Sequence, residues 1–288
     1  MNIADQLVHT TVRIECKDTD GNPSSGTGFF FRFFDNDKKF MPAIVTNKHV
    51  ICSADTVYLH LNIASKDGSP SYGDHVKFEI HDFNKHCIFH PEYKVDLAIF
   101  PAAILFQRIR EHYGCEVFFK GINRELIPSA EKIAELSAVE SILMIGYPNN
   151  LWDSNNNLPI VRNGITATPP YIDFNGLSDF VIDCACFPGS SGSPVYLYNI
   201  GSYERKEGGI ELGSRILFLG ILWGGPQHTA EGQIQVLPVP TEMKPMAFSR
   251  IPNNLGYCVK AKKLLDFEPL LSAQISVSQP SEAIENGK

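Results

Sequence analysis

The feature that most restricts the fold of this chain is an alternation of apolar and polar residues with a period of two. It runs through residues 12–16, 57–63 and 76–80. Since successive side chains of a strand point to opposite faces, this alternation is typical of half-buried β-strands. Continuous apolar runs, typical of strands buried on both faces, follow at 97–100, 141–145, 180–186, 195–198 and 216–223. Many short strands separated by turn-rich stretches predict an all-β barrel or sandwich.

Helical patterning is limited to a few short segments. Residues 104–113 and 129–136 predict short helices between two strand-rich halves, and 260–267 predicts a helix that ends before Pro269. Residues 272–288 are polar, so we expect them to form a mobile tail.

The composition excludes several classes of protein. Apolar residues make up 43% of the 288 residues, which is enough for a core. The 25 Lys and Arg residues against 32 Asp and Glu residues leave a net charge of −7, which argues against a nucleic-acid partner. No apolar run approaches the ~20 residues of a transmembrane helix, and the first ten residues do not resemble a signal peptide. We therefore expect a cytoplasmic protein with no membrane partner.

The cysteines and histidines do not predict a metal site. The seven cysteines are scattered singly, without a Cys-x-x-Cys pair, and we expect them to be reduced thiols that act as small core residues. A zinc site would have to use His81, His86, Cys87 and His90, whose spacing matches none of the usual zinc patterns. We expect neither a metal nor another cofactor.

The segment 188–194, Pro-Gly-Ser-Ser-Gly-Ser-Pro, follows an apolar strand and precedes another one. Gly189 can adopt backbone angles that turn its N–H, together with that of Ser191, toward one point. Such a pair of donors is what a developing oxyanion requires. Taken alone the signal is weak, because most Gly-Ser loops are only turns.

A serine hydroxyl is a poor nucleophile without a base and a group that orients the base. His49 follows the apolar strand 43–45, and Asp96 comes directly before the apolar run 97–100. Taken singly, His49 is better explained as a surface histidine, and Asp96 as an acid that begins a turn.

Together, these segments resemble the chymotrypsin-fold serine peptidases, most closely the HtrA-like, trypsin-like peptidases of bacteria. The resemblance extends over residues 10–267. The segments that carry it are 26–29 (GTGF), 46–50 (TNKHV), 90–98 (HPEYKVDLA), 146–148 (GYP), 162–165 (RNGI) and 183–194 (DCACFPGSSGSP). The resemblance implies an all-β fold of two six-stranded antiparallel β-barrels packed around a cleft, with short inserted helices and a C-terminal helix.

The same resemblance divides the chain. Residues 1–268 are expected to form the peptidase unit, with a first barrel at about 1–113, an inserted helical segment at about 114–139 and a second barrel at about 140–268. Residues 269–288 are expected to be a flexible tail, and we expect no PDZ-like domain after the peptidase unit.

By this resemblance His49 takes the proton from Ser191 and later returns it to the leaving amine, while Asp96 fixes the imidazole tautomer. The N–H groups of Gly189 and Ser191 form the oxyanion hole.

The resemblance also implies a substrate-binding surface. Leu222, Trp223 and Gly224 look like the strand that pairs with the extended substrate backbone. The expected walls of the primary specificity pocket are Ala185, Cys186 and Phe187, with Gly224 and Gly256 opposite.

The sequence departs from the secreted members of the family. Ser190 replaces the acidic residue that precedes their nucleophile, so we expect no need for a newly cleaved N-terminus. Leu222 replaces a serine that lies near their aspartate. An intracellular peptidase needs restraint, so we expect control by a regulatory protein partner or by segment 114–139.

The prediction is a serine endopeptidase that acts on protein or peptide substrates through an acyl-enzyme. The first alternative is a catalytically silent member of the same fold that uses the cleft as a peptide-binding module. The second is an esterase of the α/β-hydrolase type, but residues 189–193 do not fit Gly-x-Ser-x-Gly.

Overall fold

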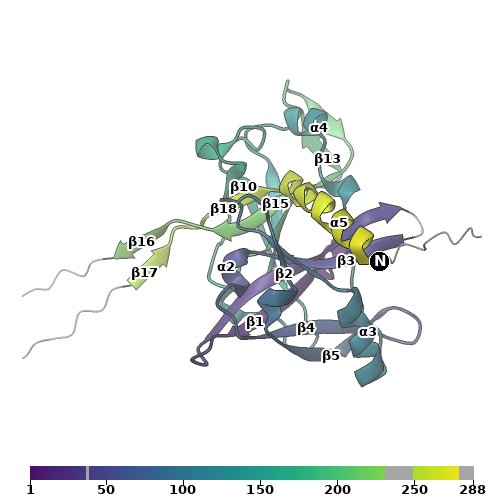
Figure 1. The fold of residues 1–288 in the computed structure, drawn as a ribbon. Coiled ribbons are helices and arrows are strands. Elements are labelled where there is room, and N and C mark those ends of the chain that lie inside the picture. The colour runs from purple at the N-terminus through teal and green to yellow at the C-terminus, as the bar shows by residue number, and fades with distance from the viewer. Residues whose placement is uncertain (37–38, 231–248, 279–288) are drawn as a thin grey trace, which may run out of the picture.

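The computed structural model describes residues 1–36, 39–230 and 249–278. It contains two β-rich halves, and the C-terminal helix lies beside both of them (Figure 1).

The first half is an antiparallel sheet with one short parallel addition. Its path runs β5-β4-β1-β2-β3-β7-β6, and β8 pairs in parallel with β2, which makes eight strands. The strands are β1 (Thr11–Lys17), β2 (Pro23–Asn36), β3 (Lys39–Thr46), β4 (Thr56–Ala64), β5 (Pro70–His81), β6 (Ile88–Phe89), β7 (Ala98–Pro101) and β8 (Ile122–Asn123).

This half differs from the six-stranded barrel that the sequence predicted, because β5 and β6 are not paired in the described part of the chain. The sheet nevertheless curves around one core, since residues from β4 and β7, near its two ends, belong to the same buried cluster. Phe83, in the short 3₁₀ helix η1 (Phe83–His86), stacks on Phe100 with ring centroids 4.7 Å apart. Side-chain packing thus connects the two ends of the sheet, although the described residues of β5 and β6 share no hydrogen-bonded ladder.

The second half is the closed antiparallel barrel that the sequence predicted, with strand order β10-β11-β18-β15-β12-β9. Its strands are β9 (Ser141–Gly146), β10 (Ile160–Thr166), β11 (Asp179–Asp183), β12 (Pro194–Asn199), β15 (Arg215–Gly224) and β18 (Leu255–Lys260). Two hairpins lie outside it, formed by β13 (Ser202–Glu204) with β14 (Ile210–Leu212) and by β16 (Gln227–Ala230) with β17 (Ser249–Pro252).

The described residues form three buried clusters: one inside each half and one shared between them. Strand β2 explains the run of phenylalanines at 29–34. Phe30 contributes to the core of the first half, whereas Phe29, Phe31 and Phe33 belong to the shared cluster. Both faces of β2 are therefore buried, which accounts for an apolar run without alternation.

Short helices connect these strands. They are α1 (Ile3–Val8), α2 (Lys48–Ile51), α3 (Ala103–Tyr113), α4 (Ala130–Ala134), η2 (Arg124–Leu126), η3 (Pro148–Asn150) and η4 (Phe174–Gly176). Helices α3 and α4 agree with the helical segments expected at 104–113 and 129–136. The N-cap Ser129 accepts a hydrogen bond at its Oγ from the Lys132 N–H, which satisfies one of the free donors of α4.

The segment 114–139, which was expected to be an inserted helical segment, contacts the first half. The N–H of Phe118 donates to the carbonyl of Asn62 at 2.8 Å, and β8 extends the sheet beside β2. Backbone groups near a sheet edge need partners, and this segment supplies them.

The C-terminus differs from the prediction that a helix ends before Pro269 and that a flexible tail follows. A 3₁₀ helix, η5 (Ala261–Phe267), leads directly into α5 (Glu268–Ser278). Pro269 lies in the first turn of α5, where its missing N–H costs nothing because that N–H has no acceptor within the helix. Leu271 is buried in the shared cluster, so residues 269–278 are helical, whereas residues 279–288 lie outside the described residues.

No helix among the described residues is both long enough and apolar enough to span a membrane.

Candidate active site

His49 and Asp96 form a close polar pair in the first half of the molecule. The Nδ1 of His49 lies 2.5 Å from Oδ2 of Asp96, and the backbone N–H of His49 donates to Oδ1 at 3.1 Å. The side chain of Asn47 donates to the backbone carbonyl of Asp96 at 2.7 Å. Both carboxylate oxygens therefore face His49, and the other ring nitrogen, Nε2, is left for a further partner. The His49 side chain is 46% exposed, so solvent and ligands can reach it.

The loop between β11 and β12, residues 184–193, is here called the nucleophile loop. It is held against the first half by Thr27 on β2. The Thr27 N–H donates to the carbonyl of Ser191 at 2.8 Å, and its Oγ1 donates to the carbonyl of Gly189 at 2.9 Å. Thr46, at the end of β3 and three residues before His49, donates from Oγ1 to the carbonyl of Thr27 at 2.9 Å.

These bonds define a junction between the halves, with His49 and Asp96 in the first half and the loop that carries Ser191 in the second. Gly192 shows how closely the parts approach, since a Cβ at this position would lie 1.9 Å from the carbonyl oxygen of Thr27. Among the described residues no hydrogen bond joins His49 to Ser191. Such a bond is often long in a protein without substrate and tightens when substrate binds.

The peptide groups of the nucleophile loop leave two N–H donors free. The carbonyl of Pro188 accepts from the Asn149 N–H at 2.6 Å, and the carbonyl of Ser190 accepts from the Ser193 N–H at 2.9 Å. In a planar trans peptide the N–H points opposite to the carbonyl, so the N–H groups of Gly189 and Ser191 point away from these acceptors. Neither donates to an acceptor in the described part of the chain.

Gly189 is required for this arrangement. Its φ is +87°, and a Cβ there would lie 2.5 Å from the carbonyl oxygen of Tyr147. Any other residue would be strained at this angle and would also collide with the backbone.

A small cavity of about 190 Å³ adjoins Ser191. Its walls are formed by Cys186, Phe187, Pro188, Ser191, Leu222, Gly224, Gly225, Pro226 and Leu255. Ala185 and Gly256, which were also expected in the walls, do not line it. Instead, the Ala185 carbonyl accepts a hydrogen bond from Arg162. A Cβ on Gly256 would lie 2.6 Å from Sγ of Cys186, which places Gly256 behind the wall.

The end of β15 offers a free edge next to this cavity. Strand β12 begins at Pro194, which pairs with Ile221. Among the described residues, the ladder on that side therefore continues only through the bonds of Leu222 with Gly192 and Ser193. The pairing with β18 is irregular between Leu222 and Gly224, which leaves Trp223 at a bulge.

Trp223 is fixed on its other side. Its Nε1 donates to Oδ2 of Asp179 at 3.2 Å, and its ring stacks on Tyr257 with centroids 5.5 Å apart. Trp223 also lines a shallow depression with His49, Lys94 and Asp96. The small cavity borders Ser191, and the depression borders His49 and Asp96. The end of β15 lies at both, through Leu222 and Trp223.

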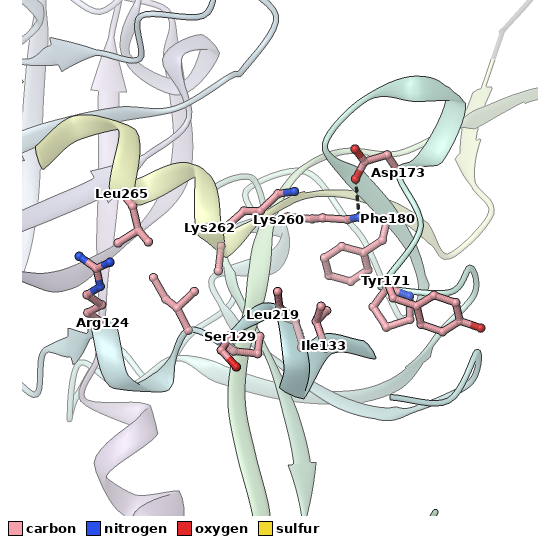
Figure 2. A pocket seen from close by; sticks show the side chains of 15 residues that line it. Arg124, Ser129, Ile133, Tyr171, Asp173, Phe180, Leu219, Lys260, Lys262 and Leu265 are labelled. Atoms are coloured by element: carbon pink, nitrogen blue, oxygen red, sulfur yellow. Dashed lines mark hydrogen bonds and ion pairs between the residues drawn. The ribbon is translucent and has the colours of Figure 1, made fainter. Parts of the chain in front are cut away.

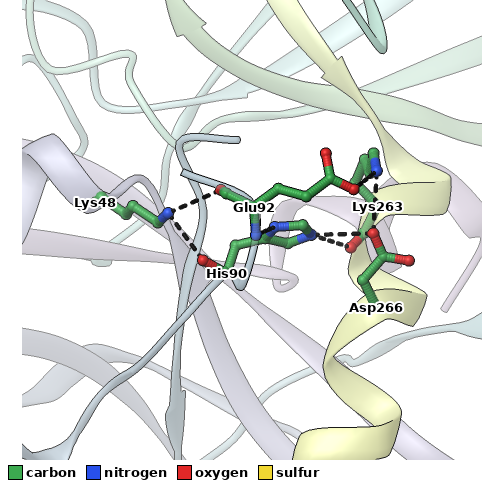
Figure 3. Close-up of polar contacts among 5 residues, drawn as sticks. All are labelled: Lys48, His90, Glu92, Lys263 and Asp266. Atoms are coloured by element: carbon green, nitrogen blue, oxygen red, sulfur yellow. Dashed lines mark hydrogen bonds and ion pairs between the residues drawn. The ribbon is translucent and has the colours of Figure 1, made fainter. Parts of the chain in front are cut away.

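The loop that carries Asp96 is anchored to the C-terminal helical segment (Figure 3). The side chain of His90 is fully buried, and its Nδ1 accepts from the Glu92 N–H at 3.1 Å. Its Nε2 therefore carries the proton and donates to the carbonyl of Lys263 at 3.1 Å, with Asp266 near by. Burial lowers the pKa of His90, which keeps the ring neutral at neutral pH.

Lys48 holds the same loop from the other side. Its Nζ donates to the carbonyl oxygens of His90 and Glu92 at 3.0 and 3.3 Å. Because Lys48 directly precedes His49 in α2, this helix is tied to the loop that carries Asp96, and that loop is in turn tied to η5.

A larger cavity, of about 680 Å³, lies on another side of the second half, between η5 and α4 (Figure 2). Phe180, Leu219 and Ile133 contribute apolar surface, and Lys260 is ion-paired with Asp173 at its edge. None of His49, Asp96 and Ser191 lines it.

Several residues that hold the site together were not singled out by sequence reasoning. Thr27 and Thr46 lie in segments that carried the family resemblance, but their roles in joining the halves were not predicted. Arg162 was noted only as part of a landmark, although its Nη1 donates to Oγ of Ser190 at 2.7 Å. Periodicity and motif spacing do not reveal such long-range contacts.

No known family model matches the chain, and no curated protein matches it. Solved structures do match. An HtrA-type protease, AlgW, with tripeptide, is 13% identical with a TM-score of 0.46, and the match covers 96% of this chain but only 63% of that chain. Catalytically active tobacco etch virus protease complexed with product is 14% identical, with a TM-score of 0.48 and coverage of 96% and 82%. The active form of the Rv3671c protease from M. tuberculosis is 14% identical, with a TM-score of 0.42 and coverage of 96% and 85%.

The strand pairings themselves define the architecture as chymotrypsin-like. It combines a curved antiparallel sheet and a closed six-stranded antiparallel barrel, with the polar pair on the first and the serine loop on the second.

Proposed function

We propose that this chain is a serine endopeptidase that hydrolyses peptide bonds through an acyl-enzyme. The observation that carries the proposal is that His49 pairs with Asp96 in the first half, while Thr27 of the same half bonds to the loop that carries Ser191. Nε2 of His49 accepts the hydroxyl proton as Ser191 attacks the substrate carbonyl, and later delivers it to the leaving amine. Asp96 holds Nδ1 protonated and stabilises the imidazolium that forms.

The two free N–H groups of the nucleophile loop, those of Gly189 and Ser191, are assigned to the oxyanion. Donors that are already oriented stabilise the developing negative charge without a reorganisation cost at the moment of reaction. The open edge at Trp223 and Gly224 is assigned to the substrate backbone, which would add as an extended strand.

Serine is favoured over cysteine as the nucleophile. Cys186 is the one thiol among the residues that form the small cavity. Burial raises the pKa of Cys186 to about 12, so its thiol stays protonated and is a weak nucleophile near neutral pH. The alternative function, a catalytically silent protein that binds peptides in the same cleft, would use the strand edge and the cavity but not the proton transfer.

Labelling with a fluorophosphonate probe tests the proposal. The wild-type protein should be labelled on Ser191, as located by peptide mass spectrometry, and Ser191→Ala should not be labelled. Ser202→Ala, which removes an exposed hydroxyl from β13, is the matched control and should label like the wild type. Labelling of a different serine, or none in the wild type, would favour the binding-module alternative.

We expect cleavage after small or medium apolar residues and strong discrimination against Lys and Arg. None of the described residues that line the small cavity carries a carboxylate, and the guanidinium of Arg162 lies behind its wall, hydrogen-bonded to Ala185 and Ser190. A basic side chain would be desolvated without a counter-ion, which should reduce kcat/KM by about 100-fold or more. Matched peptides that differ only in the residue before the scissile bond measure this ratio. A profile dominated by Lys or Arg would show that the cavity is not the specificity pocket.

A further inference from the structure

Arg162 makes an unusual connection within the second half. It lies on β10, and its Nη1 donates both to the carbonyl oxygen of Ala185, at 2.8 Å, and to Oγ of Ser190, at 2.7 Å. Ala185 is near the start of the nucleophile loop, and Ser190 directly precedes Ser191. One nitrogen atom therefore fixes the distance between the entry of the loop and its reactive end.

The charge of this guanidinium is not neutralised by the residues around it. Within the described ranges Arg162 takes part in no ion pair, and its buried Nε and Nη2 have no hydrogen-bond partner. Burial lowers the pKa of Arg162, but an arginine side chain remains charged in proteins. A buried charge without a counter-ion disfavours folding, and a neutral side chain of similar size would avoid this cost. Packing alone therefore does not explain an arginine here.

The position of the charge suggests what it does. Ser190 is completely buried, and its carbonyl is fixed by the N–H of Ser193. With Oγ also held by Arg162, both ends of Ser190 are fixed, and so is the peptide group that carries the Ser191 N–H. A positive charge behind this peptide also favours negative charge in front of it, because the interior screens weakly.

We propose that Arg162 is a positioning residue for the oxyanion hole. It holds the Ser190–Ser191 peptide so that the Ser191 N–H meets the oxyanion, and its unpaired charge adds to the stabilisation of that oxyanion. The inference rests on the proposed peptidase function. In this proposal the cation that orders the nucleophile loop is a side chain of β10 rather than a newly cleaved N-terminus.

The test compares Arg162→Met and Arg162→Lys with the wild type in steady-state hydrolysis of an apolar peptide and in the rate of fluorophosphonate labelling. Arg162→Met should lower kcat and the labelling rate by about 10- to 100-fold, while KM changes by no more than about twofold. Arg162→Lys keeps the charge and should recover part of the loss. Thermal unfolding should show no loss of stability in Arg162→Met.

Arg215→Met is the matched control. Arg215 also lies in the second half and is mostly buried, but it pairs with Glu140 rather than with the nucleophile loop. This variant should keep the wild-type kcat. If it loses as much kcat as Arg162→Met, the effect is a general one of removing a buried arginine and the inference is wrong.

A double-mutant cycle measures whether Arg162 acts on kcat through Ser190, which a purely structural role of Arg162 would not require. Ser190→Ala removes the side-chain acceptor, and the combined Arg162→Met and Ser190→Ala variant should lose little more kcat than Arg162→Met alone. Independent losses that multiply would overturn the inference, as would an Arg162→Met variant with wild-type kcat. A wild-type protein that fails to label rejects the proposed function itself, and the positioning role with it.

Discussion

The single variants Ser191→Ala and His49→Ala should each lose nearly all peptidase activity, with a loss in kcat of up to about 10⁶-fold. The double variant should lose little more, because the serine is a nucleophile only while the imidazole accepts its proton, and the imidazole acts only on that serine. The residues come from opposite sides of the junction that Thr27 bridges, and neither has another chemical role in the proposed mechanism. Initial rates with an apolar peptide, at enzyme concentrations high enough to detect residual turnover, measure these losses.

The control for this first prediction is His81→Ala. His81 is at the end of β5, its side chain is 72% exposed, and its ion pair is with Glu79 rather than with Asp96. It should keep the wild-type kcat. If the losses from Ser191→Ala and His49→Ala multiplied in the double variant, the two residues would be acting independently and the proposed mechanism would be wrong.

The second large effect is expected from Asp96→Asn, which should fold normally but lose roughly 10⁴-fold in kcat. The geometry around Asp96 gives the reason. The backbone N–H of His49 donates to Oδ1, so an asparagine would place its oxygen there and its NH₂ group opposite Nδ1. The NH₂ group would then donate to Nδ1, which forces the ring proton onto Nε2. In that tautomer Nε2 no longer accepts the proton of Ser191.

Steady-state kinetics and thermal unfolding, measured side by side, separate this effect from misfolding. Asp20→Asn makes the same chemical change in an exposed turn and should alter neither quantity. An Asp96→Asn variant with an unchanged melting temperature and a kcat within tenfold of the wild type would contradict the role assigned to Asp96.

The contacts of Asp96 were predicted only in part from the sequence motifs. The order and spacing of His49, Asp96 and Ser191 predicted a catalytic triad. In the structure His49 pairs with Asp96, and Thr27 holds the loop that carries Ser191 against the first half. Leu222 stands where the secreted chymotrypsin-fold peptidases have a serine near their aspartate, so the sequence did not indicate what supports Asp96. In the structure that support comes from the His49 N–H and, through the backbone carbonyl, from Asn47. Both partners lie within the same short segment, although nothing in its residue order indicates that they face Asp96.

The pocket walls and the C-terminus were predicted less well. Ala185 and Gly256 were assigned to the specificity pocket from the family resemblance. In the structure the carbonyl of Ala185 is bound to Arg162, and Gly256 lies behind Cys186. Pro269 was interpreted as a helix stop, yet it occupies the first turn of α5. A proline disfavours a helix interior and is tolerated in the first turn, and only the position of the helix start decides which applies.

The sequence by itself determined the strands, the turn chemistry and the reactive groups of this protein. These properties are local: a period of two buries one face of a strand, and a glycine at 189 permits the +87° angle that the nucleophile loop needs. The tertiary structure decided how the first sheet curves, which residues line the cavity, and that Arg162 reaches Ser190 over 28 positions of sequence and His90 reaches Lys263 over 173. The physical reason is that burial and charge pairing depend on which distant segments pack together, and neither the spacing nor the periodicity of residues records that packing.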